Sequence, residues 1–255
     1  MSLLVVSDLH IKGGDDPLFE SLLGLIRKAT GADTLVLAGD LFDLFVGGKS
    51  VFIERYGRFF DELKSAVARG VQVHYIEGNH DFQMQGAFSG IKGLALHRDE
   101  IELSFDGKRF FVAHGDQVDQ GDLGYLALRY FLRTPVMKTV IAAAPGKWID
   151  RIGNASSRRS RGTRSVVPME GDGGAGEGDL QRIRKIYRNF AAERLLQGYD
   201  FVILGHCHDL DEMNFSIGDR QGQYINVGYP RVHDTYLVWE PGEPKVRRES
   251  FSELR

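Results

Sequence analysis

Short apolar runs alternate with helical patterns along the first third of the chain. Continuous apolar runs occur at Leu3–Val6, Thr34–Ala38 and Val71–Ile76. Helical periodicity fills the two gaps between them, at about Pro17–Ala29 and Val51–Arg69. Strands that are apolar at every position are typical of parallel sheets covered on both faces. The pattern therefore predicts an α/β fold that begins with three parallel strands.

The rest of the chain predicts an antiparallel part of the structure. Ile101–Phe105 and Arg109–Ala113 are apolar segments on either side of Asp106-Gly107, a sequence typical of a tight hairpin. A helix, another apolar strand and three short antiparallel strands are predicted at Leu180–Phe190, Phe201–Leu204, Met213–Ile217, Gln223–Val227 and Thr235–Trp239.

One long stretch departs from this alternation. Leu123–Ser165 is apolar and basic, with nine Arg or Lys residues against one acid, Asp150. An acidic, glycine-rich segment, Met169–Asp179, follows it and is typical of a loop. A pair of solvated helices is one interpretation, but the stretch follows a histidine motif, which favours a functional role. We expect one domain, residues 1–255, with a cap insertion at about 122–179.

Composition narrows the class of protein. The chain has 255 residues, 42% hydrophobic and 26% charged, as in ordinary globular proteins, and its net charge of −3 indicates no nucleic-acid partner. Its single cysteine, Cys207, excludes an internal disulfide and suits a reducing cytoplasm. The start of the chain lacks the basic region of a signal peptide, and no apolar run is long enough to span a membrane. We expect a cytoplasmic protein.

Five short polar motifs follow predicted strands. They are Asp8-Leu9-His10, Gly39-Asp40-Leu41-Phe42-Asp43, Gly78-Asn79-His80-Asp81, His114-Gly115-Asp116 and Gly205-His206-Cys207-His208. Open α/β sheets place their ligands at the carboxyl ends of strands. Imidazole favours manganese, iron or zinc, whereas calcium and magnesium prefer oxygen ligands alone. The mixed set of Asp, Asn and His therefore predicts a transition-metal site.

Each motif alone has an ordinary explanation. Asn79 can cap a turn, and a lone histidine such as His114 is more often a hydrogen-bonded polar side chain. Cys207 is more readily explained as a small buried thiol than as a ligand. The occurrence of all five motifs in order, each at a strand end, favours a single metal centre.

The motif order resembles that of the calcineurin-like metallophosphoesterases across almost the whole chain. The resemblance implies a four-layer α/β/β/α sandwich of two mixed sheets with a helical cap. It also implies two divalent transition-metal ions, with Mn²⁺ favoured and iron or zinc as alternatives. The first ion would be held by Asp8, His10, Asp40 and His208, and the second by Asp40 as a bridge together with Asn79, His114 and His206.

The same resemblance assigns roles beside the metals. His80 matches a family histidine near the leaving group, which acts as general acid or stabilises the transition state. Asp81 would then orient His80 rather than bind metal.

A closer resemblance is to the UDP-2,3-diacylglucosamine hydrolases of lipid A biosynthesis, in which a basic, apolar cap follows the H-G-D motif, here His114-Gly115-Asp116. Residues similar to their substrate contacts are Asn79, His80, Asp122, Tyr125, Ser157, Arg161, Arg164 and His206. Apolar cap residues suited to acyl chains are Leu126, Phe131, Val140, Ile141 and Trp148. Nearby basic residues would meet phosphates or anionic lipid headgroups, so we expect a lipid-linked nucleotide sugar and peripheral contact with the inner membrane face.

The function that this resemblance implies is hydrolysis of the pyrophosphate bond of UDP-2,3-diacylglucosamine to 2,3-diacylglucosamine 1-phosphate and UMP. Water would attack the phosphorus next to uridine. One departure is His80, where those hydrolases carry arginine. A broader metal-dependent phosphodiesterase or nucleotide pyrophosphatase is the enzymatic alternative. A non-catalytic scaffold on the same fold is the alternative from another class, and the complete ligand set argues against it.

Overall fold

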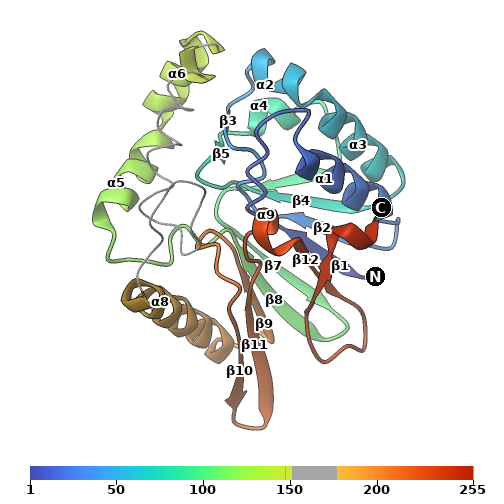
Figure 1. The fold of residues 1–255 in the computed structure, drawn as a ribbon, viewed down its shortest axis with the longest axis vertical. Helices are drawn as coiled ribbons and strands as arrows, with labels where there is room; N and C mark the ends of the chain where they lie inside the picture. The colour runs from blue at the N-terminus through green and yellow to red at the C-terminus, as the bar shows by residue number, and fades with distance from the viewer. Residues whose placement is uncertain (147, 151–176, 255) are drawn as a thin grey trace.

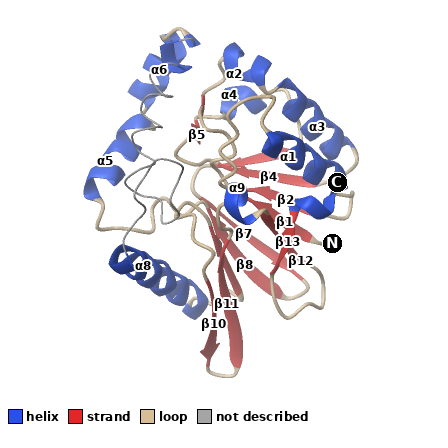
Figure 2. Ribbon diagram, viewed as in Figure 1, coloured by secondary structure: helices blue, strands red, loops and turns tan. Residues whose placement is uncertain are grey.

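Two β-sheets lie face to face in a computed structural model of the chain, and helices cover their outer faces (Figure 1, Figure 2). The structure describes residues 1–146, 148–150 and 177–254. The strand order is β13-β12-β1-β2-β4-β6 in the first sheet and β10-β11-β9-β8-β7 in the second. Parallel and antiparallel neighbours occur in both sheets, so both are mixed, as the resemblance implies.

The first sheet is built around three parallel apolar strands. Its strands are β1 (Leu3–Val6), β2 (Thr34–Leu37), β4 (Gln72–Ile76), β6 (Leu94–His97), β12 (Thr235–Trp239) and β13 (Arg247–Ser250). The pairs β1–β2, β2–β4 and β4–β6 are parallel, and β12 joins β1 antiparallel. The three parallel strands expected from the apolar runs are confirmed.

The second sheet contains the predicted hairpin. Its strands are β7 (Glu100–Phe105), β8 (Lys108–Ala113), β9 (Phe201–Leu204), β10 (Glu212–Ile217) and β11 (Arg220–Asn226). Asp106 and Gly107 both have positive φ angles, as a tight β7–β8 turn requires. β11 pairs antiparallel with β10 but parallel with β9, so the purely antiparallel arrangement expected for it is wrong. Two short strands, β3 (Phe45–Val46) and β5 (Asp81–Phe82), pair separately.

Helices complete the outer layers. They are α1 (Pro17–Lys28), α2 (Ser50–Arg55), α3 (Gly57–Ala68), α4 (Gln85–Phe88), α8 (Glu177–Leu196), α9 (Pro230–His233) and the 3₁₀ turn η1 (Phe251–Leu254). α1 and α3 pack their apolar faces on the first sheet, where Leu22 and Leu63 are fully buried. α8 packs on the second sheet through Tyr187, Ala191 and Leu195.

A separate apolar core fills the space between the sheets. Val5 and Val36 from the first sheet meet Val112, Ile203 and Ile225 from the second. The order of layers is therefore helix, sheet, sheet, helix, and the predicted four-layer sandwich is confirmed. Its parallel strands all end at one edge, where the polar motifs follow.

The helix predicted at Val51–Arg69 is instead two helices. α2 ends and α3 begins at Tyr56, whose φ of −112° and ψ of 27° are not helical. The Tyr56 ring packs on Phe42 at 4.2 Å between centroids, and its hydroxyl donates to the Ile11 carbonyl. Packing of this buried ring outweighs the continuous helical periodicity.

Two further helices, α5 (Leu123–Leu132) and α6 (Pro135–Ala143), stand beside the sandwich (Figure 1). Arg55 holds Asp150 through two hydrogen bonds, and Lys49 donates to the carbonyls of Ala142 and Ala144. The described part of this insertion is thus fastened to α2 at its far end. Its boundaries, 122–179, stay a prediction, because residues 147 and 151–176 lie outside the described residues.

Candidate metal centre

The five motifs occupy the same edge of the sandwich. Asp8 follows β1, Asp40 follows β2 and Asn79 follows β4, while His114 and His206 follow β8 and β9 of the other sheet. The strands within each group are parallel, so their carboxyl ends meet at one edge. Side chains from both sheets therefore converge.

One group of converging side chains consists of Asp8, His10 and His208, all of them buried. The Nε2 atoms of His10 and His208 lie 3.0 Å apart. Nε2 of His208 lies 3.3 Å from Oδ1 of Asp8. Two imidazole nitrogens and a carboxylate oxygen thus face one small volume.

A second group consists of Asp40, His114 and His206. Nε2 of His114 lies 3.5 Å from Oδ2 of Asp40 and 3.2 Å from Oδ1 of Asn79. The rings of His114 and His206 meet edge to face at 5.1 Å between centroids. The structure therefore brings the four residues predicted for the second ion together.

Asp40 lies between the two groups. Its Oδ1 accepts a hydrogen bond from the backbone N–H of His80 at 2.8 Å. Its Oδ2 lies 3.8 Å from Nε2 of His10 and 3.5 Å from Nε2 of His114. One carboxylate oxygen therefore faces both groups, as a bridging ligand must.

The backbone around these side chains is strained. Among the described residues, eight other than glycine have positive φ, and five of them are Asp8, His10, Asp40, His206 and His208. Such conformations cost of order 1–3 kcal/mol each and cluster at functional sites. These strained conformations turn the five side chains toward one another, and the rest of the fold compensates for their cost in free energy.

Two glycines let the motif loops approach closely. A Cβ atom at Gly78 would overlap the carboxylate of Asp40, and one at Gly205 would overlap the carboxylate of Asp8. No other residue type fits at these positions without displacing a candidate ligand.

The charge balance of the centre fits a divalent cation. Burial alone would lower the pKa of His114, but the adjacent Asp40 carboxylate outweighs burial and raises that pKa to about 10. Burial and the charge of His114 lower the pKa of His206 to about 4. An imidazole that retains its proton so strongly reports surplus negative charge, which a bound metal ion would neutralise. The buried set of carboxylate, amide and imidazole donors matches the chemistry of such an ion.

His80 has a fixed orientation beside both groups. Its Nδ1 lies 2.8 Å from the carbonyl oxygen of Asp43, and a carbonyl only accepts, so Nδ1 carries the proton. Its ring meets that of His10 edge to face, with centroids 4.8 Å apart. A ligand atom of His80 also lies within 4.8 Å of one from His10 and one from Asp40, so His80 adjoins the shared carboxylate.

Asp81 does not orient the His80 ring, so the role expected for it is wrong. Its Oδ1 accepts from the N–H groups of Asp40 and Gly78, both at 2.9 Å. Its Oδ2 accepts from the Leu41 N–H and the Tyr75 hydroxyl. Burial and the charge of Asp40 raise the Asp81 pKa to about 7. Asp81 instead ties together the loops that carry Asp40 and Asn79.

Of the two described cap residues predicted to contact substrate, Tyr125 lies near a candidate metal ligand, whereas Asp122 caps a helix. Asp122 caps α5 by accepting from the Tyr125 N–H at 2.9 Å. Tyr125 is buried, donates its hydroxyl to Asp116 at 2.7 Å and lies 5.9 Å from the His206 ring between centroids. Ser157, Arg161 and Arg164 lie outside the described residues, and their predicted substrate contacts stay predictions.

An ion-pair network links α5 to the centre, and the sequence analysis missed it. Arg129 bonds to Asp116 at 2.6 Å and to Asp99 at 2.7 Å. Arg133, one helical turn further on, donates to the Gly78 carbonyl at 2.8 Å. The i, i+4 spacing of the two arginines was visible in the sequence, but nothing there indicated their partners.

Cys207 points away from the candidate ligands. It packs in the core beneath α8, and the Asn226 amide lies 3.2 Å from its sulfur. Burial raises the pKa of this thiol. The geometry agrees with a small buried thiol between two histidines that face the candidate centre.

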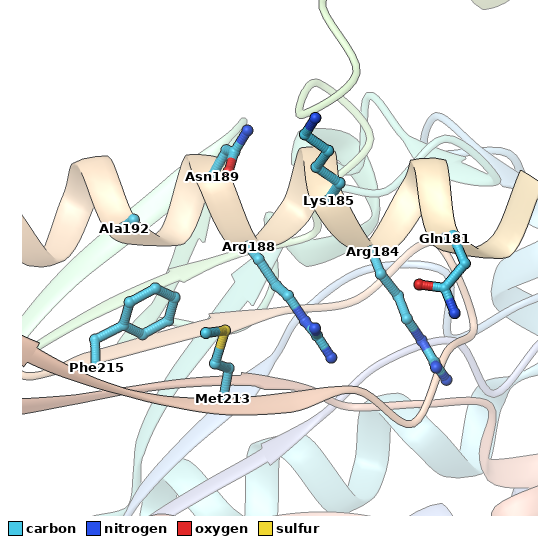
Figure 3. A pocket seen from close by; sticks show the side chains of 8 residues that line it. All are labelled: Gln181, Arg184, Lys185, Arg188, Asn189, Ala192, Met213 and Phe215. Carbon is cyan, nitrogen blue, oxygen red and sulfur yellow. The ribbon is translucent and has the colours of Figure 1, made fainter.

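A hollow of about 250 Å³ lies elsewhere, between α8 and β10 (Figure 3). Its lining residues are Gln181, Arg184, Lys185, Arg188, Asn189, Ala192, Met213 and Phe215. Arg184 and Arg188 are each held by two hydrogen bonds, to Asp209 and Asp211. These arginines fasten the loop that follows His208 to α8.

Comparison with known proteins agrees with this geometry. Residues 1–210 match the family described as calcineurin-like phosphoesterase. A UDP-2,3-diacylglucosamine hydrolase of Aeromonas salmonicida is 26% identical, covering 100% of this chain and 96% of that protein. One from Neisseria gonorrhoeae is 28% identical, covering 93% and 97%, and one from Aeromonas hydrophila is 25% identical, covering 98% and 100%.

The chain belongs to the calcineurin-like phosphoesterase family, whose profile matches most of its length. It is a metal-dependent hydrolase, and its candidate ligand clusters suit divalent metal ions. Within the described part of the chain, no helix combines the length and the apolar character needed to cross a bilayer.

Proposed function

We propose that the protein hydrolyses the pyrophosphate bond of UDP-2,3-diacylglucosamine, giving 2,3-diacylglucosamine 1-phosphate and UMP. The observation that carries the proposal is the convergence of side chains from five motifs into groups of candidate ligands that share the Asp40 carboxylate. Relatives that carry this activity in their names match the chain over nearly its whole length. Together they support a two-metal phosphoesterase acting on a lipid-linked nucleotide sugar in lipid A biosynthesis.

In this proposal the candidate ligands divide between two ions, with manganese favoured. Asp8, His10 and His208 would hold the first, Asn79, His114 and His206 would hold the second, and Asp40 would contribute to both. Two such ions supply positive charge that orients phosphate oxygens and promotes the ionisation of an attacking water. Asp40 fixes the separation of the half-sites, because its other oxygen is anchored by the His80 N–H.

His80 is the proposed group beside the departing phosphate. The Asp43 carbonyl holds Nδ1, so the imidazole presents Nε2 in a set direction. When both ring nitrogens carry protons, Nε2 donates a hydrogen bond or a proton as negative charge develops on the leaving oxygen.

The cap is the proposed receptor for the acyl chains. Phe131, Val140 and Trp148 expose 53%, 51% and 65% of their surface, as apolar residues at an interaction site do. Ile141 was expected to join them, but it is buried as part of the apolar core that contains the first sheet. The proposed acyl surface therefore excludes Ile141.

A second candidate is a broader phosphodiesterase or nucleotide pyrophosphatase with a soluble substrate. The observation that favours it is His80 itself, which is the general family form and stands where the resembled hydrolases carry arginine. Under this alternative the apolar cap would contribute nothing to substrate choice.

A comparison of substrates separates the two. Manganese-loaded protein should be assayed with UDP-2,3-diacylglucosamine, its deacylated form and a chromogenic phosphodiester. Each buried methylene contributes roughly 0.8 kcal/mol, so burying only four predicts a preference for the acylated substrate above about 100-fold in kcat/KM. Equal efficiencies on the acylated and deacylated substrates would overturn the lipid proposal and favour the broader enzyme.

A further inference from the structure

The segment between β11 and β12 packs behind the first half of the centre, although none of the five motifs includes it. Tyr229 precedes α9 and is buried. Its ring stacks on that of His208, with centroids 4.6 Å apart and planes 7° from parallel. The same ring meets His10 edge to face at 6.1 Å. One aromatic side chain therefore limits the rotation of two candidate ligands.

Arg231, two residues later, holds the backbone of the same half-site. One of its terminal nitrogens, Nη2, lies 3.1 Å from the His10 carbonyl and 3.4 Å from the Leu9 carbonyl. That nitrogen also pairs with Oδ2 of Asp16 at 2.7 Å. Asp16 in turn caps α1 through the Leu18 N–H. The guanidinium thus ties the loop after β1 to the start of α1.

This support coincides with strained backbone. His10 and His208 have φ angles of +46° and +60°, in the left-handed region that residues with a Cβ rarely adopt. A strained conformation persists only when its surroundings determine it strongly. Tyr229 stabilises these conformations by packing on the two imidazole rings, and Arg231 does so by bonding to the His10 carbonyl.

The second half-site has different supports. Nδ1 of His114 lies 3.0 Å from the Ala38 carbonyl, which fixes that ring. Asp81 fastens the loops that carry Asp40 and Asn79. The contacts of Tyr229 and Arg231 described above go instead to the first half-site and the loop around it.

We propose that Tyr229 and Arg231 are positioning residues that hold His10 and His208 ready for the first metal ion and leave the second half-site unaffected. The inference rests on the proposed two-metal function and adds to it a separate support for one ion. Groups that orient metal ligands typically change metal affinity by 10–100-fold.

The test is a calorimetric titration of metal-free protein with Mn²⁺, accompanied by elemental analysis after dialysis. The variants are Tyr229→Leu, Tyr229→Phe and Arg231→Gln. Tyr199→Leu is the matched control, because it removes an equally buried ring at the start of β9, away from the motif edge. Tyr229→Phe keeps the stacked ring but removes the side-chain hydrogen bond to Arg231, so it should bind the first ion more tightly than Tyr229→Leu does.

We expect wild type to bind two Mn²⁺ ions. Tyr229→Leu and Arg231→Gln should bind one ion with wild-type affinity and the other at least about 10-fold more weakly. Wild-type affinity for both Mn²⁺ ions in Tyr229→Leu and Arg231→Gln would overturn the inference. Equally reduced affinity for both ions in every variant, the Tyr199→Leu control included, would also overturn it. Failure of wild type to bind metal would instead refute the two-metal proposal itself, and the inference with it.

Discussion

At the scale of single residues, hydrogen bonds and ring packing fix the orientation of the side chains in the candidate centre. His80 cannot turn freely, because the Asp43 carbonyl holds Nδ1 and the His10 ring lies against it. Asp81 cannot reach that imidazole, because four donors occupy its two oxygens. The motif G-N-H-D therefore combines an imidazole held beside the candidate ligands with a carboxylate that fastens the loops.

Replacing His80 by alanine tests its role beside the leaving group. His80→Ala should keep both metal ions and lower turnover by roughly 10²–10⁴, the range for loss of an acid–base group. Steady-state kinetics with metal analysis of the same samples provides the measurement. Loss of metal from this variant would show that His80 is a ligand.

Replacing His80 by arginine tests how it acts. Arginine donates hydrogen bonds but no proton near neutral pH. Because the resembled hydrolases carry arginine there, the proposed function predicts that His80→Arg is far more active than His80→Ala on UDP-2,3-diacylglucosamine. Equal losses in the two variants would indicate proton transfer and a different substrate.

At the scale of elements, β4 and β6 meet through a pair of histidines outside the centre. Nδ1 of His74 lies 3.0 Å from Nε2 of His97. Burial, then the neighbouring His97, lowers the pKa of His74 to about 4, and burial also lowers the pKa of His97. Both imidazoles are therefore neutral in the folded chain at neutral pH.

This pair should make the sheet sensitive to acid. Below pH 6.5 the unfolded chain binds protons that the folded His74 resists, so the free energy of unfolding falls between pH 6.5 and about 4. His74→Gln should reduce this loss by about 1 kcal/mol at pH 5, allowing for partial solvent screening. Urea unfolding at pH 7.5 and 5 measures it, with Lys92→Gln as the control. A pH dependence identical to wild type would contradict the account.

The elements also show how far the sequence pattern reaches. Apolar runs located β1, β2, β4 and β9, because strands buried on both faces leave a continuous signal. β13 was missed, since its sequence Arg247–Ser250 is polar, and its pairing with β12 became visible only in the folded chain. A local sequence pattern indicates which strands are buried, but it does not indicate which strands pair with each other.

The same limit applies to the centre. The ligand candidates were predictable, because each motif sits at a strand end that the apolar runs define. Tyr229 and Arg231 were not, because their roles depend on tertiary contacts: Tyr229 stacks on His208, and Arg231 bonds to residues more than 200 positions earlier. An isolated tyrosine and arginine carry no such signal in the sequence.

At the scale of the whole molecule, a net charge of −3 coexists with a strongly basic insertion. Arg129 and Arg133 in its described part are occupied by ion pairs with Asp99 and Asp116. Any attraction to a membrane must therefore come from the remaining basic residues. Of these, Arg158, Arg159, Arg161 and Arg164 lie outside the described residues.

Binding to anionic vesicles tests this charge distribution. Sedimentation with vesicles should fall as salt rises, because exposed charges are screened beyond about 8 Å at physiological ionic strength. Charge reversal at Arg158, Arg159, Arg161 and Arg164 should weaken binding further, whereas Lys64→Glu on α3 should not. Binding that ignores both salt and these arginines would exclude the cap as a membrane surface.

The central claim is that five motifs form one two-metal centre joined by Asp40. Metal content of purified wild type and Asp40→Ala, measured by elemental analysis, tests it most directly, with Asp61→Ala on α3 as an exposed-carboxylate control. We predict about two transition-metal ions per chain in wild type and in Asp61→Ala, and well under one in Asp40→Ala, because the lost carboxylate faces both half-sites. Two ions retained by Asp40→Ala would contradict the claim.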